Sequence, residues 1–562
     1  MSRGPKLMSR DFVAESTRIT PVYRPKQVEK TAPCQTGCAN CGDIRGWIGT
    51  ISQRAKTGLS REEAFTRAWQ IIAEVNPFPS ALGRVCPHPC ENHCNRSELD
   101  EPLAINAMER FLGDWAIEKK IALSRLDMEE KKEWLGVVGA GPSGLSFAYQ
   151  MVRLGYRVTV YESGEKAGGM LRYGVPDYRL PQDILEAEIG RILDLGVELK
   201  LNTFVGRDIT LEQLRERHDA LYLGIGAQMG RGLGLPGEEG PSVWTGTEYL
   251  SRLNRGETID LGARVLVIGG GNTAVDAARS ARRTGAEASI LYRRTRDEMP
   301  AVDHEIEDAL EEGVEILFLV APVRIERHAD GRILALEACR MELGEADASG
   351  RRRPLEIPGS GFTIRTDSLI AAVSQLPELR GLEALNRDGN WLISDDAGNV
   401  GDEVLAGGDA LGLGIAGNAI VQGRRAAEEL HARFTGSRAQ RPEDERPGIG
   451  PDKVRFDYKP EAPAAQSPKL PGEERVRMGS AEVARTISEE QFLAETERCF
   501  SCGSCFGCEQ CSMYCTTGCF TKVEEVSQGV YFTLALDECH ECGKCVEVCP
   551  CGFLEVRSEK ES

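Results

Sequence analysis

Blocks of apolar and polar residues follow one another between residue 134 and about residue 435. Short β-branched runs such as WLGVV and RVTVY are followed by glycine-rich turns and by stretches with helical character. This order of strand, turn and helix is typical of parallel α/β folds. The pattern therefore predicts a parallel sheet covered by helices across the middle of the chain.

The residues before this region predict helices instead. In SREEAFTRAWQIIAEVNPFP, Ser60 and Glu63 have the spacing of a capping box, and the Asn76-Pro77 pair ends the helix. Residues from about 437 to 485 are rich in proline and charge, which predicts a tether. From about residue 490 onward, twelve cysteines dominate the sequence.

Composition and charge narrow the class of protein. The 562 residues are 41% hydrophobic and carry a net charge of −19, which disfavours nucleic acid or an anionic membrane as the main partner. We find no secretory signal and no window of ~20 apolar residues that could cross a bilayer. We therefore expect a cytoplasmic protein, in which nineteen clustered cysteines indicate metal binding rather than disulfides.

The first glycine motif lies in WLGVVGAGPSGLSFAYQMVRLGYRVTVYE. Gly139 permits a tight turn, Gly141 lets a pyrophosphate approach the backbone, and Gly144 allows close packing of helix on strand. The helix N-terminus faces the phosphates, and Glu162 at the end of the second strand can accept a hydrogen bond from a ribose hydroxyl. The motif predicts a dinucleotide site.

A second copy lies in ARVLVIGGGNTAVDAARSARRTGAEASILYRR. Gly269 and Gly271 open its turn, and Ala274 takes the third glycine position, which the motif tolerates. The acidic residue is absent, and Arg293 and Arg294 stand at the strand end. Guanidinium groups suit a 2′-phosphate, which favours NADPH over NADH. The alternative is a solvated basic loop.

A late segment, VLAGGDALGLGIAGNAIVQGRRAAEEL, would close the first site through Gly407, Gly408 and Asp409. The helix that follows would direct its N-terminus at an isoalloxazine ring. Two dinucleotide folds, with the second inserted into the first, describe a flavin-dependent reductase.

The motifs GGMLRYGVPDYRLP, GGGNTAVD, YRRTRDEMPA and AGGDA make the chain resemble the glutamate synthase small-subunit family over roughly residues 30 to 435. That family includes the electron-input half of dihydropyrimidine dehydrogenase. The resemblance implies FAD in the first fold, NADPH or NADH in the second, and hydride transfer to flavin N5 without a side-chain acid or base. It implies cofactor contacts from Gly139, Gly141, Pro142, Ser143, Gly144, Glu162, Gly169, Leu171, Arg179, Gly269, Gly271, Asn272, Thr273, Arg293, Arg294, Gly408, Asp409 and Asn418.

Six N-terminal cysteines lie in two groups, namely Cys34, Cys38, Cys41, and Cys86, Cys90, Cys94. Family members use such cysteines for two [4Fe–4S] clusters, which need eight ligands. Either one cluster is present here, or other groups complete a second one. Glu109 is a candidate ligand by the resemblance, and it could equally be an ordinary helix carboxylate. A zinc site is the alternative for the six cysteines.

The C-terminal cysteines form two runs with ferredoxin spacing, Cys505-x2-Cys508-x2-Cys511-x3-Cys515 and Cys539-x2-Cys542-x2-Cys545-x3-Cys549-Pro550. In two-cluster ferredoxins the fourth cysteine of each run ligates the other cluster. We therefore expect Cys549 to join the first three cysteines of the first run, and Cys515 to join those of the second. Four cysteines are surplus and are interpreted first as inert thiols, with alternative ligands or a third cluster left open: Cys499, Cys502, Cys519 and Cys551.

The ferredoxin-like extension resembles that of DsrL-type proteins and of subunits attached to 2-oxoacid oxidoreductases. The resemblance implies an electron-transfer flavoprotein that passes electrons between NAD(P)H, FAD and iron–sulfur clusters, to or from a partner oxidoreductase or ferredoxin. Alternatives are a glutamate synthase small subunit or a self-contained reductase of an organic substrate. A homo-oligomer is possible, and the direction of electron flow is open.

The expected fold class is multidomain α/β, with a helical N-terminal iron–sulfur domain, two nested Rossmann-like domains and a C-terminal bacterial ferredoxin-like α+β domain. The expected division is a [4Fe–4S] domain at 1–130, an FAD domain at 131–250 and 376–436, an NAD(P)H domain at 251–375, a proline-rich linker at 437–488 and a module for two [4Fe–4S] clusters at 489–562.

Overall fold

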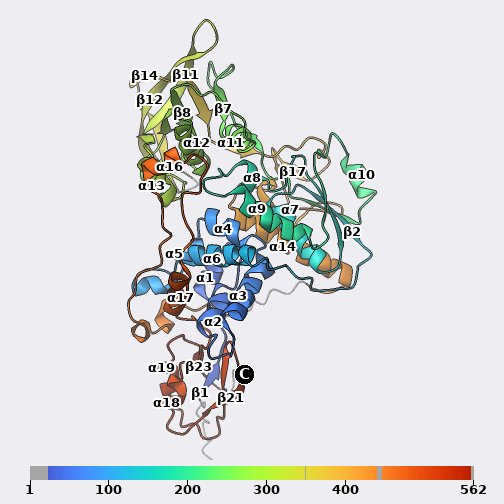
Figure 1. Ribbon diagram of the computed structural model, residues 1–562, viewed down its shortest axis with the longest axis vertical. Helices are drawn as coiled ribbons and strands as arrows, with labels where there is room; N and C mark the ends of the chain where they lie inside the picture. Colours follow the sequence, from blue (N-terminus) through green and yellow to red (C-terminus); the bar gives the residue numbers. More distant parts are fainter. Residues whose placement is uncertain (1–22, 348–349, 396, 439–445, 559–562) are drawn as a thin grey trace, which may run out of the picture.

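The computed structural model describes residues 23–347, 350–395, 397–438 and 446–558. Its parts follow one another along a long axis (Figure 1). The second α/β fold occupies one end, the first α/β fold lies to the side of the middle, and the N-terminal helices lie between them and the cysteine-rich C-terminal residues at the other end. Among the described residues, no helix is long and apolar enough to cross a membrane.

The first α/β fold is a six-stranded sheet in the order β19-β20-β5-β2-β3-β4. Its strands are parallel except for the antiparallel edge strand β19, and helices α7 and α14 pack against each other beside the sheet. The elements are β2 (Trp134–Val138), α7 (Pro142–Arg153), β3 (Arg157–Tyr161), β4 (Glu198–Lys200), β5 (Ala220–Leu223), β19 (Asn399–Gly401), β20 (Val404–Ala406) and α14 (Ala416–Thr435). Strand β20 and helix α14 come after the second fold in the sequence, so the second fold is an insertion in the first.

The second α/β fold has a five-stranded parallel sheet in the order β10-β9-β8-β15-β7, followed by an antiparallel sheet of β11 to β14. The elements are β7 (Val243–Thr245), α11 (Gly246–Asn254), β8 (Arg264–Ile268), α12 (Asn272–Arg283), β9 (Glu287–Tyr292), α13 (Asp303–Glu311), β10 (Glu315–Phe318), β11 (Val320–Arg327), β12 (Ile333–Ala346), β13 (Arg352–Glu356), β14 (Phe362–Arg365) and β15 (Ser368–Ala371). The expected mixed α/β class is therefore confirmed for the middle of the chain.

The N-terminal helices are α1 (Pro33–Gly37), α2 (Ile44–Ser52), α3 (Arg61–Val75), α4 (Pro79–Val85), α5 (Pro89–Asn92) and α6 (Ile105–Glu118). The predicted capping box is present, because the Ser60 side chain accepts from the Glu63 backbone N–H and the Glu63 side chain accepts from Ser60. Helix α3 ends at Val75, directly before the Asn76-Pro77 pair. The buried side chains Ile48, Phe65 and Met108 form the core between these helices.

The C-terminal part contains α17 (Glu489–Arg498), α18 (Gln510–Tyr514), the hairpin of β21 (Phe520–Ser527) and β22 (Val530–Leu534), α19 (Lys544–Glu547) and β23 (Leu554–Ser558). Strand β1 (Tyr23–Gln27) pairs antiparallel with β23. This pairing of the two ends of the chain was not predicted, because each strand is short and its partner lies more than 500 residues away in the sequence.

The proline-rich segment does not hang free, as the tether interpretation implied. Ile449 and Val454 are buried against Phe500, and Arg475 in α16 (Gly472–Arg477) forms ion pairs with Asp308 and Glu311 of the second fold. Its apolar and basic side chains therefore contact both neighbouring parts of the molecule. The described portion, 446–488, is therefore a packed strap along the molecule.

Glu188 joins the first α/β fold to the helical part. It lies in α9 (Gln182–Leu193) and accepts hydrogen bonds from the backbone N–H groups of Ser80 and Ala81, at 2.7 and 2.9 Å, at the start of α4. Burial raises the pKa of this carboxyl from 4.5 to about 8. The folded chain therefore holds a proton that the unfolded chain releases at neutral pH.

Because the folded-state pKa lies above the unfolded value, the stability linked to Glu188 falls as the pH rises from about 4.5 to about 8. We expect the thermal midpoint of the wild-type chain to fall more steeply between pH 5 and pH 8 than that of Glu188→Gln, whose amide does not titrate. Parallel pH profiles for the two proteins would contradict this assignment.

Candidate cofactor and cluster sites

The first glycine turn has the geometry that a dinucleotide needs. Gly139 has a φ of +97°, and a Cβ at Gly144 would lie 2.0 Å from the Gly139 carbonyl oxygen, so both positions require glycine. A Cβ at Gly141 would meet nothing closer than Gly169, at 3.7 Å. Gly141 therefore faces open space at the N-terminus of α7, where a pyrophosphate would approach the backbone.

Other predicted residues of this site gather around the same turn. Glu162 follows β3 and accepts from the Ala140 and Gly164 backbone N–H groups, both at 2.7 Å. The Ser143 hydroxyl lies 2.6 Å from that of Tyr222, and a Cβ at Gly408 would lie 3.0 Å from Ser143. The late segment therefore returns to the first turn, as the motif required.

The remaining residues of the first site are placed as follows. Asp409 accepts from the Gly414 backbone N–H at 3.1 Å, and burial raises its pKa. Asn418 is exposed in the first turn of α14. Pro142 is the first residue of α7, whereas Leu171 is buried in the core of the fold. Leu171 is therefore a core residue that supports the site.

The second glycine turn repeats the first. Gly269 has a φ of +147°, and a Cβ there would lie 2.2 Å from the Ala372 carbonyl oxygen. A Cβ at Gly271 would meet nothing closer than Pro300, at 4.0 Å. Asn272 accepts from the Val302 backbone N–H at 2.9 Å. The open space again lies at a helix N-terminus, that of α12.

The structure separates the two arginines that the sequence treats alike. Arg294 is buried and donates to the Arg352 carbonyl oxygen and to Asp347, both at 2.7 Å. Arg293 is exposed. Arg293 is therefore the arginine that is available to a phosphate group of a bound nucleotide, while Arg294 holds β13 against the loop after β9.

Arg179 has a structural partner on the second fold. Its guanidinium lies 2.7 Å from Asp276 in α12 and 3.0 Å from Glu305 in α13. All three side chains are almost fully buried. The arginine therefore connects the loop after α8 (Met170–Tyr173) to the second fold, and the cofactor contact that the resemblance implied stays a prediction.

One group of buried donors lies next to the late segment of the first fold. Burial first, and then the nearby charges of Glu109 and Cys38, raise the pKa of Cys86 to about 12. Burial, followed by the charges of Cys38, Glu109 and Cys86, also raises the pKa of Cys90. Burial also raises the pKa of Glu109 to about 7, although a 2.8 Å hydrogen bond from the Asn76 amide lowers this pKa in part. The group is Cys38, Cys86, Cys90 and Glu109.

The loop that carries Cys38 touches the helix of the late segment. Arg424 of α14 donates to the Asn40 carbonyl oxygen at 3.3 Å, and Arg425 lies 3.9 Å from the Cys41 sulfur. A Cβ at Gly417 would lie 3.2 Å from Ala39. This cysteine group thus lies against the fold that carries the first nucleotide turn, and Cys41 lies beside the Arg425 guanidinium.

The C-terminal cysteines influence one another's pKa values in two sets, and their assignment as ligands stays a prediction. Burial, then Cys508 and Cys549, raise the pKa of Cys505 to about 11, and burial with Cys505, Cys508 and Cys549 raises that of Cys511 to about 12. In the second group, burial, then Cys542, Cys515 and Cys539, raise the pKa of Cys545 to about 11. Cys519 and Cys551 lie beside Cys515 and Cys549.

Buried thiols with raised pKa values suit metal ions, because a cation replaces the proton and stabilises the thiolate. Backbone N–H groups also point at sulfur, from His88 to Cys86 at 3.4 Å and from Cys519 to Cys515 at 3.3 Å. Such bonds tune iron–sulfur clusters. The donor sets therefore fit the groups that the sequence indicated.

A model of the pyridine nucleotide-disulphide oxidoreductase family matches residues 134–423. The chain belongs to this family. A second model, described as dihydropyrimidine dehydrogenase domain II with a 4Fe-4S cluster, matches residues 20–121. The chain is therefore an oxidoreductase of the FAD- and NAD(P)-binding type with an iron–sulfur domain before the flavoprotein part, which confirms the predicted cofactor classes.

Curated relatives carry the similarity further. The chain is 38% identical to the NADPH-Fe(3+) oxidoreductase subunit beta of Geobacter sulfurreducens over 66% of this chain and 55% of that protein. It is 32% identical to the glutamate synthase [NADPH] small chain of Azospirillum brasilense over 73% of this chain and 87% of that one. With YgfK of Escherichia coli it shares 31% identity over 96% of this chain and 49% of that protein. The chain thus spans about half of two of these relatives.

Among solved structures, FprA of Mycobacterium tuberculosis in complex with NADPH has a TM-score of 0.48 and 18% identity, over 56% of this chain and 88% of that one. The family model, which covers both α/β folds, is the observation that decides the family.

Proposed function

We propose that the chain is an electron-transfer subunit that passes reducing equivalents between NAD(P)H and a partner oxidoreductase or ferredoxin, through FAD and [4Fe–4S] clusters. One observation carries the proposal. The loop of the first N-terminal cysteines contacts helix α14 of the first nucleotide fold, and the N-terminal helices lie between the two α/β folds and the module that carries the C-terminal cysteines (Figure 1).

The two nucleotide sites have separate tasks in this proposal. FAD, when bound, converts the two-electron chemistry of a nicotinamide into single-electron steps. The chain supplies the open backbone at Gly141 and Gly271 for the two pyrophosphates, and the Arg179 ion pairs hold the two folds in register. The expected FAD part, 131–250 with 376–436, loses β7 and α11 to the second fold, so residues 131–242 with 376–436 would bind FAD and residues 243–375 would bind NAD(P)H.

The C-terminal module, residues 489–562, is proposed as a ferredoxin-like α+β domain for two [4Fe–4S] clusters. Support comes from the β21–β22 hairpin, from the short helices α18 and α19 within the two cysteine runs, and from the gathering of each run's first three cysteines around the last cysteine of the other run. Each run thereby supplies ligands to both sites.

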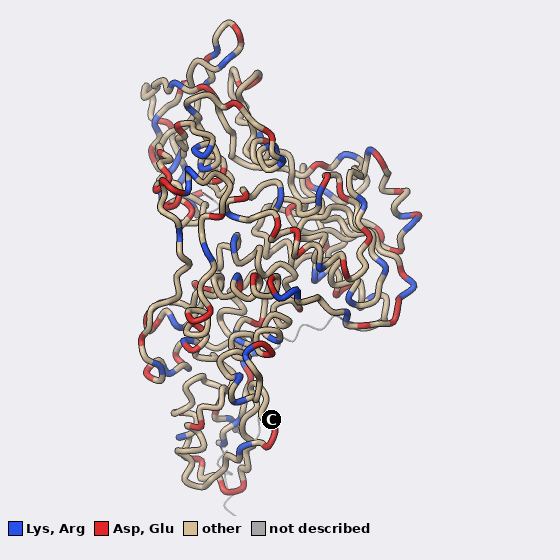
Figure 2. The backbone as a smooth tube through the Cα atoms, in the orientation of Figure 1, with Lys and Arg blue, Asp and Glu red and all other residues tan. Residues whose placement is uncertain are grey.

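Charge suggests the kind of partner that would receive the electrons. Lys and Arg are interspersed with Asp and Glu along both α/β folds (Figure 2). In the C-terminal module, acidic residues outnumber basic ones. We propose a partner subunit with a basic docking face, in the cytoplasm, where the nineteen free thiols would stay reduced.

The proposal is tested with anaerobically purified full-length chain. We expect bound FAD, iron with acid-labile sulfide, and reduction of a viologen dye by NADPH that is faster than by NADH. Copurification from native extract would identify the partner subunit. A preparation with neither flavin nor labile sulfide would end the proposal.

The exposed Arg293 makes the nucleotide preference testable. We expect Arg293→Ser to raise the KM for NADPH at least tenfold, about 1.4 kcal/mol, and to change the KM for NADH little, because only NADPH carries the 2′-phosphate. Arg294→Ser is the matched control: it should lower the thermal midpoint through the loss of its bonds to Asp347 and Arg352, without this selectivity. Equal effects of Arg293→Ser on both KM values would contradict the assignment.

A second candidate is a glutamate synthase small subunit, favoured by the 87% coverage of the Azospirillum brasilense chain. That alignment covers 73% of this chain. This candidate function does not explain the cysteines of the C-terminal module. The test is glutamate formation from 2-oxoglutarate and glutamine after addition of a large glutaminase subunit. Formation of glutamate would establish this function over the first.

A further inference from the structure

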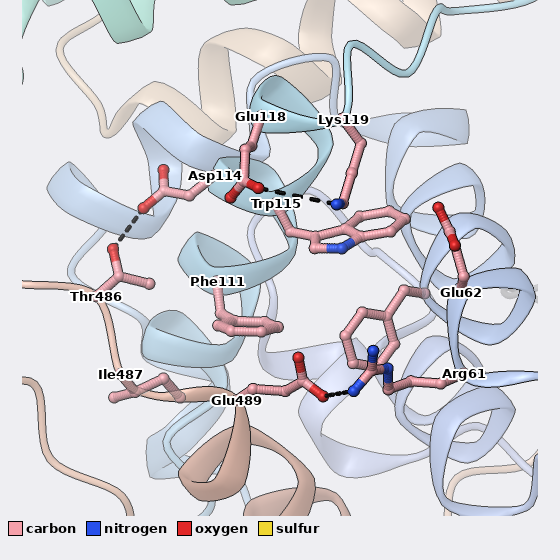
Figure 3. A pocket seen from close by; sticks show the side chains of 11 residues that line it. Arg61, Glu62, Phe111, Asp114, Trp115, Glu118, Lys119, Thr486, Ile487 and Glu489 are labelled. Carbon is pink, nitrogen blue, oxygen red and sulfur yellow. Dashed lines mark hydrogen bonds and ion pairs between the residues drawn. The ribbon is translucent and has the colours of Figure 1, made fainter.

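Two of the surplus cysteines are held against the N-terminal cysteines. The strap of residues 446–488 and the start of α17 contact the N-terminal helices beside a pocket of about 380 Å³ (Figure 3). Thr486 donates to Asp114 at 2.5 Å, and Glu489 forms an ion pair with Arg61 at 2.6 Å. Helix α17 follows, and its Phe492 is buried against Phe65 and Phe111. Cys499 directly ends this helix.

The Cys499-x2-Cys502 loop is fixed on the residues after Cys94. Arg96 donates to the Arg498 carbonyl oxygen at 3.1 Å and lies over the Phe500 ring at 5.2 Å. The Asn95 amide lies 3.6 Å from the Cys502 sulfur, and Arg45 donates to the Cys502 carbonyl oxygen at 2.8 Å. Position and orientation of the loop are therefore set by buried contacts on both sides.

The four thiols of these segments lie in the same part of the molecule. Cys34, Cys94 and Cys499 pack against one apolar core, as do Cys38 and Cys90 of the other set, and the Asn95 contact places Cys502 beside Cys94. Burial, then Cys499, Cys94 and Cys502, raise the pKa of Cys34, and burial, then Cys499 and Cys94, raise that of Cys502 to about 12. The Ser501 backbone N–H also points at the Cys499 sulfur at 3.4 Å. Four thiols, two from each end of the chain, thus share one buried region.

We propose that the two ends of the chain share one [4Fe–4S] cluster, which is ligated by Cys34, Cys94, Cys499 and Cys502. This proposal rests on the proposed electron-transfer function and adds a ligand set to it. It resolves the shortage of N-terminal ligands, because Cys38, Cys86, Cys90 and Glu109 remain as a set of four for a second cluster. Eight ligands then serve two clusters.

A single metal ion and an iron–sulfur cluster require different spacings of the four sulfurs. Among the described residues, no three His, Cys, Asp or Glu side chains converge closely enough to hold a single metal ion. Bonds of about 2.3 Å would draw four sulfurs close together around Zn²⁺, whereas the sulfurs around an iron–sulfur cube stand further apart. Four thiolates are the full ligand set of such a cube, and their formation releases four protons.

The shared cluster would make the series of sites continuous. Cys34 and Cys38 are four residues apart, Cys502 and Cys505 three, and Cys511 and Cys515 four. Since an extended residue spans at most ~3.6 Å, neighbouring sites are joined by ligands whose Cα atoms lie within about 14 Å. Cys499 and Cys502 would thus connect the C-terminal module to the N-terminal donors through one short stretch of chain.

The test compares two double variants of the full-length chain, prepared anaerobically. We expect Cys499→Ser/Cys502→Ser to lose about four iron and four labile sulfide atoms per chain, with the loss of one low-temperature EPR signal and with FAD content unchanged. The control, Cys519→Ser/Cys551→Ser, changes the other two surplus cysteines and should keep all iron. FAD content reports in both cases whether the flavoprotein part is folded.

A second variant keeps the test decisive if the double variant folds poorly. Cys34→Ser should remove the same EPR signal, and Cys34→Ser/Cys499→Ser/Cys502→Ser should lose no more iron than Cys34→Ser alone. Full iron content in the Cys499/Cys502 variant, additive losses, or bound zinc lost in place of iron would overturn the proposal. A wild-type chain without FAD or iron would instead end the proposed function itself.

Discussion

Replacing Gly141 by alanine is expected to remove most of the bound FAD while the chain stays folded. Gly141 has a φ of −81° and a ψ of −178°, which alanine adopts without strain, and its Cβ would meet no protein atom closer than 3.7 Å. The added methyl group would instead stand where the pyrophosphate must approach the backbone. We expect FAD affinity to fall on the order of 10- to 100-fold, about 1.4 to 2.7 kcal/mol.

Gly271→Ala is the matched control in the second fold. Its φ of −93° and its open surroundings also accept a Cβ, so the fold should again survive. We expect a higher KM for NADPH with unchanged FAD content, which is the reverse of the Gly141→Ala result. Flavin absorbance per chain and steady-state kinetics measure the two quantities. Full FAD retention in Gly141→Ala would show that the first turn does not hold the flavin nucleotide.

Gly144→Ala separates a steric effect from a ligand effect. Its Cβ would lie 2.0 Å from the Gly139 carbonyl oxygen, so the substitution should disturb the strand–helix contact itself. We expect a lower thermal midpoint even with excess FAD present, in contrast to Gly141→Ala, for which excess FAD should restore the wild-type midpoint.

The features that sequence predicted well are local. The glycine turns, the strands around them and the capping box of α3 each depend on residues within about 30 positions, and the structure places them as expected. The C-terminal cysteine runs are local in the same sense, since each has a ferredoxin pattern of its own, and their ligand assignment stays a prediction. In these cases the sequence pattern and the physical cause lie in the same stretch of chain.

The features that sequence missed depend on contacts between distant segments. Arg293 and Arg294 are neighbours with the same chemistry, and only the fold shows that one is buried against β13. The pairing of β1 with β23 and the packing of residues 446–488 leave no periodic pattern to find. For Cys499 and Cys502 a signal existed, because a Cys-x2-Cys pair stood outside both runs while the N-terminal sites lacked ligands.

The buried ion pairs of Arg179 are expected to hold the two α/β folds together. Arg179→Met would leave Asp276 and its neighbour Glu305 as buried carboxylates without this partner. Removal of one member of a buried pair typically costs about 3–5 kcal/mol, because the remaining charge stays desolvated. We expect faster hydrogen exchange in α12 and a lower thermal midpoint, whereas Glu337→Gln, which breaks an exposed pair with Arg324, should cost under about 1 kcal/mol.

A double variant distinguishes an interface role from the cofactor contact that the resemblance implied. Arg179→Met/Asp276→Asn removes the cation together with one of the carboxylates, so it should be more stable than Arg179→Met alone. If Arg179 instead binds a cofactor, Arg179→Met should lose FAD or raise the KM for NADPH at an unchanged thermal midpoint, and the second substitution should rescue nothing. Stability that recovers in the double variant is the result that requires an ion pair between the folds, because a cofactor contact has no reason to depend on Asp276.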